Sequence, residues 1–122
     1  MLSINKTRYS YYLEAFFSAT DVIQFWFDEI EPKQRFIKDL EFDELLRSRF
    51  EETHQRARQG LLYAWREHSL DALAEIIVLD QFSRNMYRDT ARAFETDTLA
   101  LVLAQEAIRR KFDKELDNSK RA

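Results

Sequence analysis

The chain has 122 residues, of which 45% are hydrophobic and 34% charged, with one Gly, one Pro and no Cys. This length fits one domain, and the scarcity of Gly and Pro predicts helices rather than a turn-rich sheet. A net charge of -3 supplies no basic field for phosphate backbones or anionic lipid, so we predict neither nucleic-acid nor membrane binding. The lack of Cys excludes a disulfide framework and a thiolate zinc site, and it fits the cytoplasm, the compartment that we predict. We identify no signal peptide and no apolar run of membrane-spanning length.

The chain divides into three parts by composition. Residues 1–19 are predicted to be an aromatic extension, and residues 20–112 the helical domain. Residues 113–122 have no apolar face, so we expect a polar tail that frays. The extension has apolar residues at the spacing of a short amphipathic helix: Tyr9, Tyr12, Leu13, Phe16 and Phe17.

Two amphipathic helices are predicted first in the helical domain. We expect the first to begin at an N-cap on Thr20 and to end before Pro32. Its apolar face consists of Val22, Ile23, Trp26, Phe27 and Ile30. The second is longer, because Asp39 is placed to cap it and Gly60 to stop it. Its predicted apolar stripe consists of Phe42, Leu45, Leu46, Phe50 and Ala57.

Two further helices complete the predicted domain. A short apolar turn, LLYAWREH, leads to a third helix for which Ser69 is the expected cap. Apolar residues fall nearly all round its segment 70–82, which predicts the most buried element of the fold. The last long helix is expected to begin between Thr90 and Thr96 and to run to Phe112. The predicted fold class is therefore all-α, an antiparallel array of four to five helices.

Polar residues fall on the apolar side of the third helix. At 100° per residue, Asp80 and Arg84 project on the same side as Leu73 and Ile77. They are four residues apart with the acid first, which is the favourable order for an ion pair on a helix. Asn85 follows directly, and Asn tolerates the left-handed conformation. We therefore expect Asn85 to end this helix in that conformation.

A second carboxylate is predicted to meet this pair. Asp97 lies near the start of the last helix, where the helix dipole stabilises an anion. It projects on the same side as three apolar residues that we expect to face the core: Leu101, Ala104 and Ile108. If the two helices pack face to face, Arg84 bridges Asp80 and Asp97.

Two interpretations of this cluster compete. In the one that we favour, a buried ion-pair network fixes how the helices pack, so that Arg84→Ala lowers stability by several kcal/mol. In the other, Arg84, Arg88 and Arg92, with Tyr87 between them, line a pocket for a carboxylate or phosphate, which guanidinium groups bind well.

Other candidate sites are weaker. Glu51 and His54 have the Glu-x-x-His spacing of di-iron bundles, but His68 is the one other histidine and lacks a Glu three residues earlier. Ser83 and His54 are a possible nucleophile and base, yet nothing resembling a strained elbow turn surrounds Ser83. We therefore predict no metal and no cofactor.

The order of several segments carries a resemblance to a known family. DVIQFWF, FDELLRSRFEETHQRARQG, ALAEIIVLDQFSRNMYRDTARAFETD and TLALVLAQEAI resemble the bacterial family known as domain of unknown function 924, over roughly residues 20–111. The resemblance implies an all-helical fold similar to tetratricopeptide arrays, and no established activity. The family's recurrent polar positions fall on Asp80, Gln81, Arg84, Asn85, Arg88, Phe94 and Asp97.

The chain also departs from the family's pattern. Ser83 stands where the family typically has Pro, and Arg35 where it often has Trp. Family members usually continue for several more helices, so the resemblance implies a truncated member in which a site built from both halves is incomplete.

We therefore expect a cytoplasmic protein–protein interaction module of the tetratricopeptide-like kind, binding a protein partner on stacked helices. Self-association through exposed apolar surface is a further expectation. The alternative is a small enzyme or ligand-binding protein with an anion pocket around Arg84 and Arg88. A third possibility is a truncated chain without independent function.

Overall fold

A computed structural model describes residues 18–35, 38–117 and 120, and these residues form helices without any strand. The prediction of an all-α fold is confirmed. The α-helices are α2 (Ala19–Gln24), α3 (Leu40–Arg58), α4 (Ser69–Ile77), α5 (Ser83–Met86) and α6 (Asp97–Arg109). Two segments are π-helical, η1 (Phe25–Glu29) and η4 (Val78–Phe82), and four are short 3-10 helices, η2 (Pro32–Arg35), η3 (Tyr63–Glu67), η5 (Ala91–Phe94) and η6 (Phe112–Glu115).

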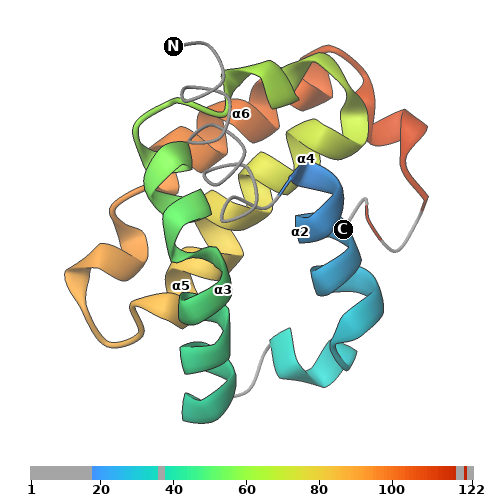
Figure 1. The fold of residues 1–122 in the computed structure, drawn as a ribbon. Coiled ribbons are helices and arrows are strands. Elements are labelled where there is room, and N and C mark those ends of the chain that lie inside the picture. The colour runs from blue at the N-terminus through green and yellow to red at the C-terminus, as the bar shows by residue number, and fades with distance from the viewer. Residues whose placement is uncertain (1–17, 36–37, 118–119, 121–122) are drawn as a thin grey trace, which may run out of the picture.

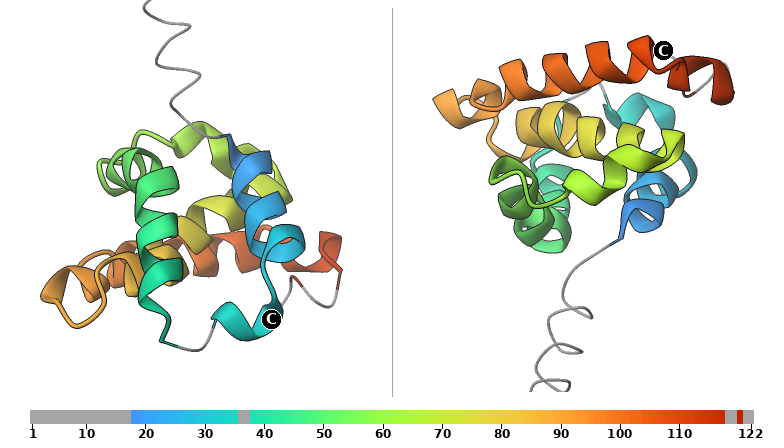
Figure 2. Two further views of the ribbon diagram at one scale, coloured as in Figure 1. Left: turned by 60° about the horizontal axis from the view of Figure 1, so that its bottom comes forward. Right: turned by 90° about the horizontal axis from the view of Figure 1, so that it is seen from above.

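The helices lie in three layers, with the continuous segment α4–η4–α5 in the middle (Figure 1). Seen from above, α6 lies along one side of this segment, while α2 and α3 lie on the other (Figure 2, right). The contacts agree, since α4 packs against both α2 and α6, and α3 packs against η4 and α5. The apolar segment 70–82 thus occupies the centre of the fold, as its composition predicts.

The first helix begins two residues earlier than predicted. Ser18 is the N-cap, because its hydroxyl accepts a hydrogen bond from Asp21 N at 3.3 Å and its own N–H donates to Asp21 Oδ2 at 2.9 Å. This reciprocal pair gives the backbone N–H groups of Ser18 and Asp21 a hydrogen-bond acceptor each. Thr20 lies inside the helix and has no such role. The prediction of Thr20 as the cap is wrong, and the end of the helix before Pro32 is confirmed.

Helix α3 begins and ends where the sequence predicts. Asp39 caps it by accepting a hydrogen bond from Phe42 N at 3.1 Å. Gly60 follows its end with a φ of 78°, the left-handed region that favours glycine. The predicted stripe is buried apart from Leu45, which is 47% exposed, because the buried face is rotated toward Thr53 and His54.

The middle segment changes its helical type along its length. Ser69 is already the first residue of α4 and His68 precedes it in extended conformation, so Ser69 as the cap is wrong. The helix then widens into η4 before α5 resumes at Ser83. Phe82 within η4 is fully buried and meets Phe50 and Phe25 at ring-centroid distances of 4.9 and 6.1 Å.

Helix α6 begins at Asp97, one residue after the predicted window, with Thr96 as its N-cap. It ends at Arg109, three residues before the predicted end at Phe112. Lys111 follows with a φ of 64°, and the chain turns so that Phe112 packs back into the protein. The expectation that Leu101 and Ile108 face the core is wrong, since they are 58% and 61% exposed.

The predicted division into three parts stays a prediction. Most of the aromatic extension lies outside the described residues. No helix of the described chain combines the length and the apolar character that crossing a membrane requires.

Candidate functional site

The predicted bridge between two helices is present. Arg84 Nε donates to Asp80 Oδ1 at 2.9 Å, and the second nitrogen Nη2 donates to Asp97 Oδ2 at 3.2 Å. The pKa of Arg84 is raised above its ordinary value, first by the hydrogen bond to Asp80 and also by Asp97. Gln81 joins the cluster from the side, since its amide donates to Asp80 Oδ2 at 3.1 Å.

The bridge is nevertheless not buried. The side chains of Arg84, Asp80 and Asp97 are 43%, 31% and 37% exposed. The prediction that this bridge is buried is therefore wrong. Because exposed ion pairs contribute little, we expect Arg84→Ala to cost about 1 kcal/mol or less, and not several. The reason lies in η4, since a π turn takes more residues than an α turn and rotates the residues that follow it away from the α-helical phase.

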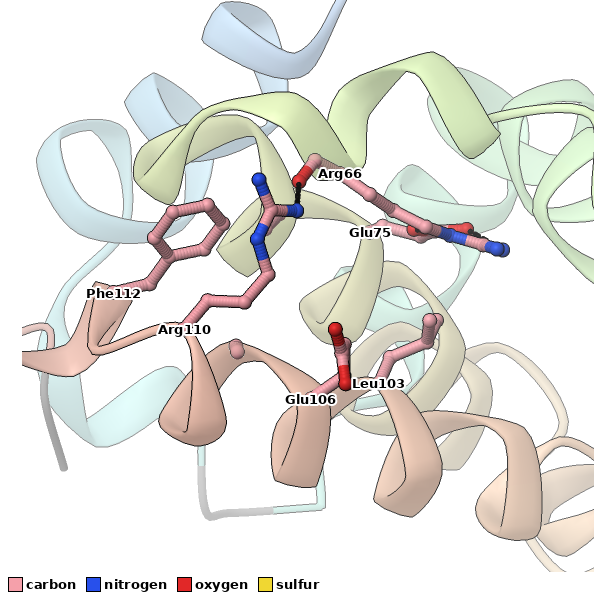
Figure 3. A pocket seen from close by; sticks show the side chains of 8 residues that line it. Arg66, Glu75, Leu103, Glu106, Arg110 and Phe112 are labelled. Atoms are coloured by element: carbon pink, nitrogen blue, oxygen red, sulfur yellow. Dashed lines mark hydrogen bonds and ion pairs between the residues drawn. The ribbon is translucent and has the colours of Figure 1, made fainter.

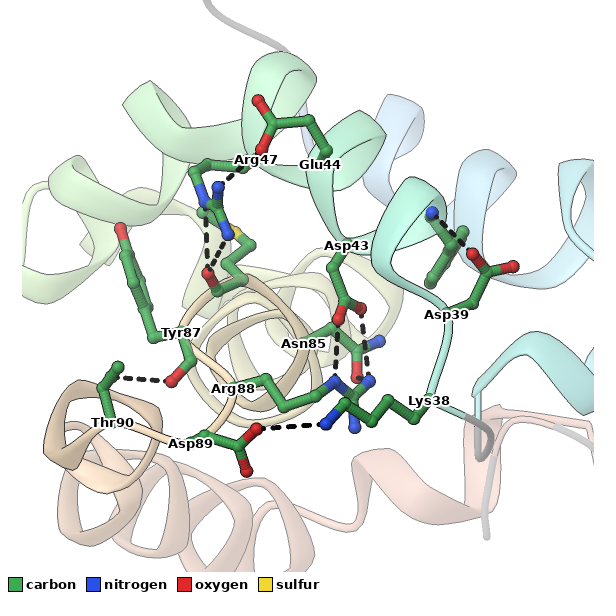
Figure 4. A network of polar contacts seen from close by, with 12 residues as sticks. Lys38, Asp39, Asp43, Glu44, Arg47, Asn85, Tyr87, Arg88, Asp89 and Thr90 are labelled. Carbon is green, nitrogen blue, oxygen red and sulfur yellow. Dashed lines mark hydrogen bonds and ion pairs between the residues drawn. The ribbon is translucent and has the colours of Figure 1, made fainter.

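A second ion pair, which the sequence does not predict, is buried. Arg88 donates to both oxygens of Asp43, at 2.7 and 3.2 Å, and thereby ties the end of α5 to α3 (Figure 4). Asp43 is 3% exposed, and its hydrogen bond is the first cause of the raised pKa of Arg88. Arg47 adds a second tie, because its guanidinium donates to Met86 O at 2.8 and 3.2 Å.

Asn85 lies in this buried contact and does not end its helix. It is helical and 5% exposed, and its side-chain oxygen accepts from Arg88 at 3.2 Å. The residue with a left-handed backbone is Asp89, at a φ of 65°, so the prediction for Asn85 is wrong. Asp89 also pairs with Lys38 at 3.3 Å (Figure 4).

The three arginines of the predicted anion pocket have separate partners. Arg84 stacks over Phe94 at 5.0 Å from the ring centroid, while Arg92 lies over Tyr87 at 4.0 Å. Arg88 is held by Asp43 and does not line the hollow that Arg84 lines. Arg84, Arg88 and Arg92 thus contact different partners, and the anion pocket stays a prediction.

A buried polar network joins α3, α5 and the start of α6. His54 Nε2 lies 2.6 Å from Ser83 Oγ, which lies 3.1 Å from Thr96 Oγ1. The Thr96 hydroxyl donates to Leu79 O at 2.6 Å. Burial lowers the pKa of His54 to about 4, and the positive charges of Arg92 and Arg58 add to this.

This network is structural and not a nucleophile with its base. Ser83 is 0% exposed and His54 1%, so no substrate reaches the hydroxyl. The sequence gives no sign of a strained elbow turn at Ser83, and it does not predict the packing contact between Ser83 and His54. The available signal was that His54 continues the buried stripe of α3 by one turn from Phe50.

A groove runs along the seam between α4 and α6, on the side of the Arg84 cluster. One hollow of about 340 Å³ is lined by Asp80, Arg84 and Asp97 together with apolar residues. A neighbouring hollow of about 190 Å³ is lined mainly by apolar side chains, including Leu73 and Ile108. The two hollows share Ile76 and Ala104, so they form one groove with a charged end and an apolar end.

The opposite side of the seam is closed. A hollow there of about 20 Å³ has room for about one water molecule (Figure 3). Arg66 donates to both oxygens of the buried Glu75 at 2.9 and 2.8 Å, and Arg110 donates to Arg66 O at 2.6 Å. These contacts attach the end of α6 to η3 and leave no space for a ligand.

No metal cluster is found in the described part of the chain: none of its groups of three or more His, Asp or Glu side chains could hold an ion. The predictions of no metal and no cofactor stay predictions.

Comparison with known proteins identifies the family of this chain. The profile of the family described as "bacterial protein of unknown function (DUF924)" matches residues 22–122. The chain belongs to this family, which confirms the resemblance seen in its motifs.

A solved structure of a protein of unknown function from Agrobacterium tumefaciens is similar, with a TM-score of 0.80 and 39% sequence identity. The match covers 84% of this chain and 58% of that protein, so the chain spans a little over half of the longer relative. A search of the curated proteins gave no match.

Proposed function

We propose that the chain is a protein–protein interaction module and that it docks its partner on the outer surface of α6. We call this surface the α6 face, and it consists of Thr98, Leu101, Val102, Gln105 and Ile108. The single observation that carries the proposal is the exposure of this face. Leu101, Val102 and Ile108 are 58%, 52% and 61% exposed, whereas Ala100 is the buried residue of the helix.

The groove beside the α6 face supports the same function. A helix that lies in an apolar groove is a common mode of protein recognition, with anchors spaced three and four residues apart. The charged end of the groove, at Asp80, Arg84 and Asp97, would orient such a partner, since charges at a rim contribute more to specificity than to affinity. The arginine of this cluster is exposed enough to serve in that role.

The alternative of an anion pocket has less support. Arg84 and Arg88 are both engaged by carboxylates within the protein, which compete with an incoming anion. We also propose that the helices are arranged as in tetratricopeptide proteins and that the protein is cytoplasmic. The lack of Cys supports the cytoplasmic location.

Photo-crosslinking in living cells tests the proposal. A photoreactive phenylalanine analogue replaces Ile108 on the α6 face, and in a control variant it replaces Glu41, an exposed residue of α3. We expect a discrete crosslinked product from position 108 and none from position 41. Equal labelling at both positions, or none at either, would contradict the proposal.

A further inference from the structure

We propose that the partner of the α6 face is a second copy of this chain, with the two α6 helices antiparallel across a two-fold axis. This inference rests on the proposed function, because it names the occupant of the same surface. A two-fold contact brings the same patch of both copies together, so the patch must be complementary to itself.

The charges of α6 are arranged for antiparallel self-pairing. At its start, Asp80 and Asp97 surround Arg84, which leaves one negative charge in excess. At its end, Arg109, Arg110 and Lys111 follow one another, with Glu106 and Asp113 as acidic neighbours, which leaves one positive charge in excess. An antiparallel pair places each acidic start beside a basic end, whereas a parallel pair places like charges together.

Lys111 is the cation best placed for this contact. Arg109 is held by Glu106 at 2.6 Å, and Arg110 donates to Arg66 O and stacks over Phe112. Lys111 is exposed, and the described part of the chain gives it no ion-pair partner. It can therefore reach the carboxylates of the other copy without breaking a contact.

The spacing of the α6 face suits a helix partner. Thr98, Leu101, Gln105 and Ile108 follow one another at intervals of three, four and three residues, the pattern of a seam between two helices. In the antiparallel arrangement, Leu101 faces the C-terminal half of the other helix, where Ile108 lies. Thr98 then lies beside the end of the other helix, near its Arg109.

The expected dimer is weak. A helix of this length is about 20 Å long, so the contact falls below the area of standard stable interfaces. The association is therefore expected to need a high protein concentration, and covalent trapping is a suitable assay.

Disulfide trapping tests the orientation. The chain has no Cys, so any disulfide in a single-cysteine variant joins two copies. A mixture of Thr98→Cys and Arg109→Cys chains is oxidised at about 100 micromolar. Random collision of equal amounts would give twice as much mixed dimer as either homodimer, and we expect a mixed fraction well above that ratio. The reason is that two Thr98 positions lie at least roughly 15 Å apart along antiparallel helices, beyond the reach of a disulfide. A dominant Thr98→Cys homodimer would overturn the antiparallel arrangement.

Charge reversal at the end of α6 provides the second readout. Lys111→Glu should weaken the concentration-dependent association of the cysteine-free chain several-fold in sedimentation velocity. Lys114→Glu makes the same charge change on η6 and should leave association unchanged. Equal effects of the two variants, or a monomer at every concentration, would overturn the inference.

The crosslinking at Ile108 separates the two proposals. If position 108 crosslinks to a different protein and no mixed disulfide forms, the interaction module stands and the second copy is rejected. If neither assay gives a product, both proposals fall.

Discussion

The middle segment Ser69–Met86 has two polar faces that differ in their surroundings. On its inner side, Glu75 and Ser83 are fully buried, and each has a partner from another part of the chain. On its outer side, Asp80 and Arg84 form a pair of similar chemistry that is exposed to solvent. The inner contacts fix the packing of the helices. The outer pair is exposed, so it remains accessible to a binding partner. Burial, and not the type of side chain, separates the two roles.

The largest effect is expected on the inner side. Arg66→Ala removes the partner of Glu75, which is 0% exposed, and leaves a buried carboxylate unpaired. We expect a loss of about 3 to 5 kcal/mol in the free energy of unfolding, measured by urea denaturation. Arg109→Ala removes the partner of the exposed Glu106 and should cause no measurable change. A small effect of Arg66→Ala would break the contrast between the two faces.

The buried His54 makes the stability of the protein depend on pH. The pKa of His54 is about 4 in the native protein and its ordinary value is 6.5, so the unfolded chain binds the proton first. Stability from this group is therefore complete above pH 6.5 and falls as the pH drops toward 4, by about 3 kcal/mol in all. Urea denaturation between pH 7.5 and 4.5 measures the slope.

Two histidine variants show whether this pH dependence comes from His54. His54→Gln should remove its part of the dependence, while the exposed His68→Gln should retain the slope of the unchanged protein. An identical slope in all three proteins would mean that His54 does not hold a lowered pKa.

The hydroxyl of Ser83 gives a smaller effect. Ser83→Ala removes the partner of both His54 Nε2 and Thr96 Oγ1 inside the protein. We expect a loss of about 1 to 3 kcal/mol in thermal or urea unfolding, the cost of leaving the buried His54 Nε2 unpaired. Thr96 keeps its hydrogen bond to Leu79 O. Ser48→Ala, on the exposed surface of α3, is the matched control and should be nearly neutral. Equal losses would show that the network contributes nothing specific.

The smallest effect on stability is expected on the outer side. Ile108→Glu places a charge at a position that is 61% exposed, so the free energy of unfolding should change by no more than about 0.5 kcal/mol. The same variant should lose binding at the α6 face. A variant that unfolds would place Ile108 in the core and end the docking proposal.

Much of the fold could be predicted because its signals are local. Asp39 and Gly60 delimit α3 through contacts within a few residues, and hydrophobic periodicity locates the central segment. Thr20 is not the cap because Ser18, two residues earlier, forms a reciprocal pair with Asp21. Ser69 differs from the cap by one residue, since α4 begins at Ser69 after His68. The pairing of Asp80 with Arg84 was also local, at four residues.

The rest of the candidate site could not be predicted because it depends on the π turn in η4 and on contacts between residues far apart in the sequence. The π turn of η4 shifts the helical phase, so the projection at 100° per residue placed Arg84 too far inside. Arg88 meets Asp43 across 45 residues, and His54 meets Ser83 across 29. Such contacts depend on how the helix layers pack against one another, and the residue pattern of a single helix does not predict that packing.

The most direct test compares Arg84, which lies in α5, with Arg88, which lies just after the end of α5. The free energy of unfolding is measured by urea denaturation for Arg84→Ala and Arg88→Ala beside the unchanged protein. We expect a loss of at most about 1 kcal/mol for the exposed Arg84, and a loss of several times that for Arg88, whose removal leaves Asp43 buried and unpaired. Equal losses, or a larger loss for Arg84, would contradict the division into a structural inner face and a surface that is free to bind.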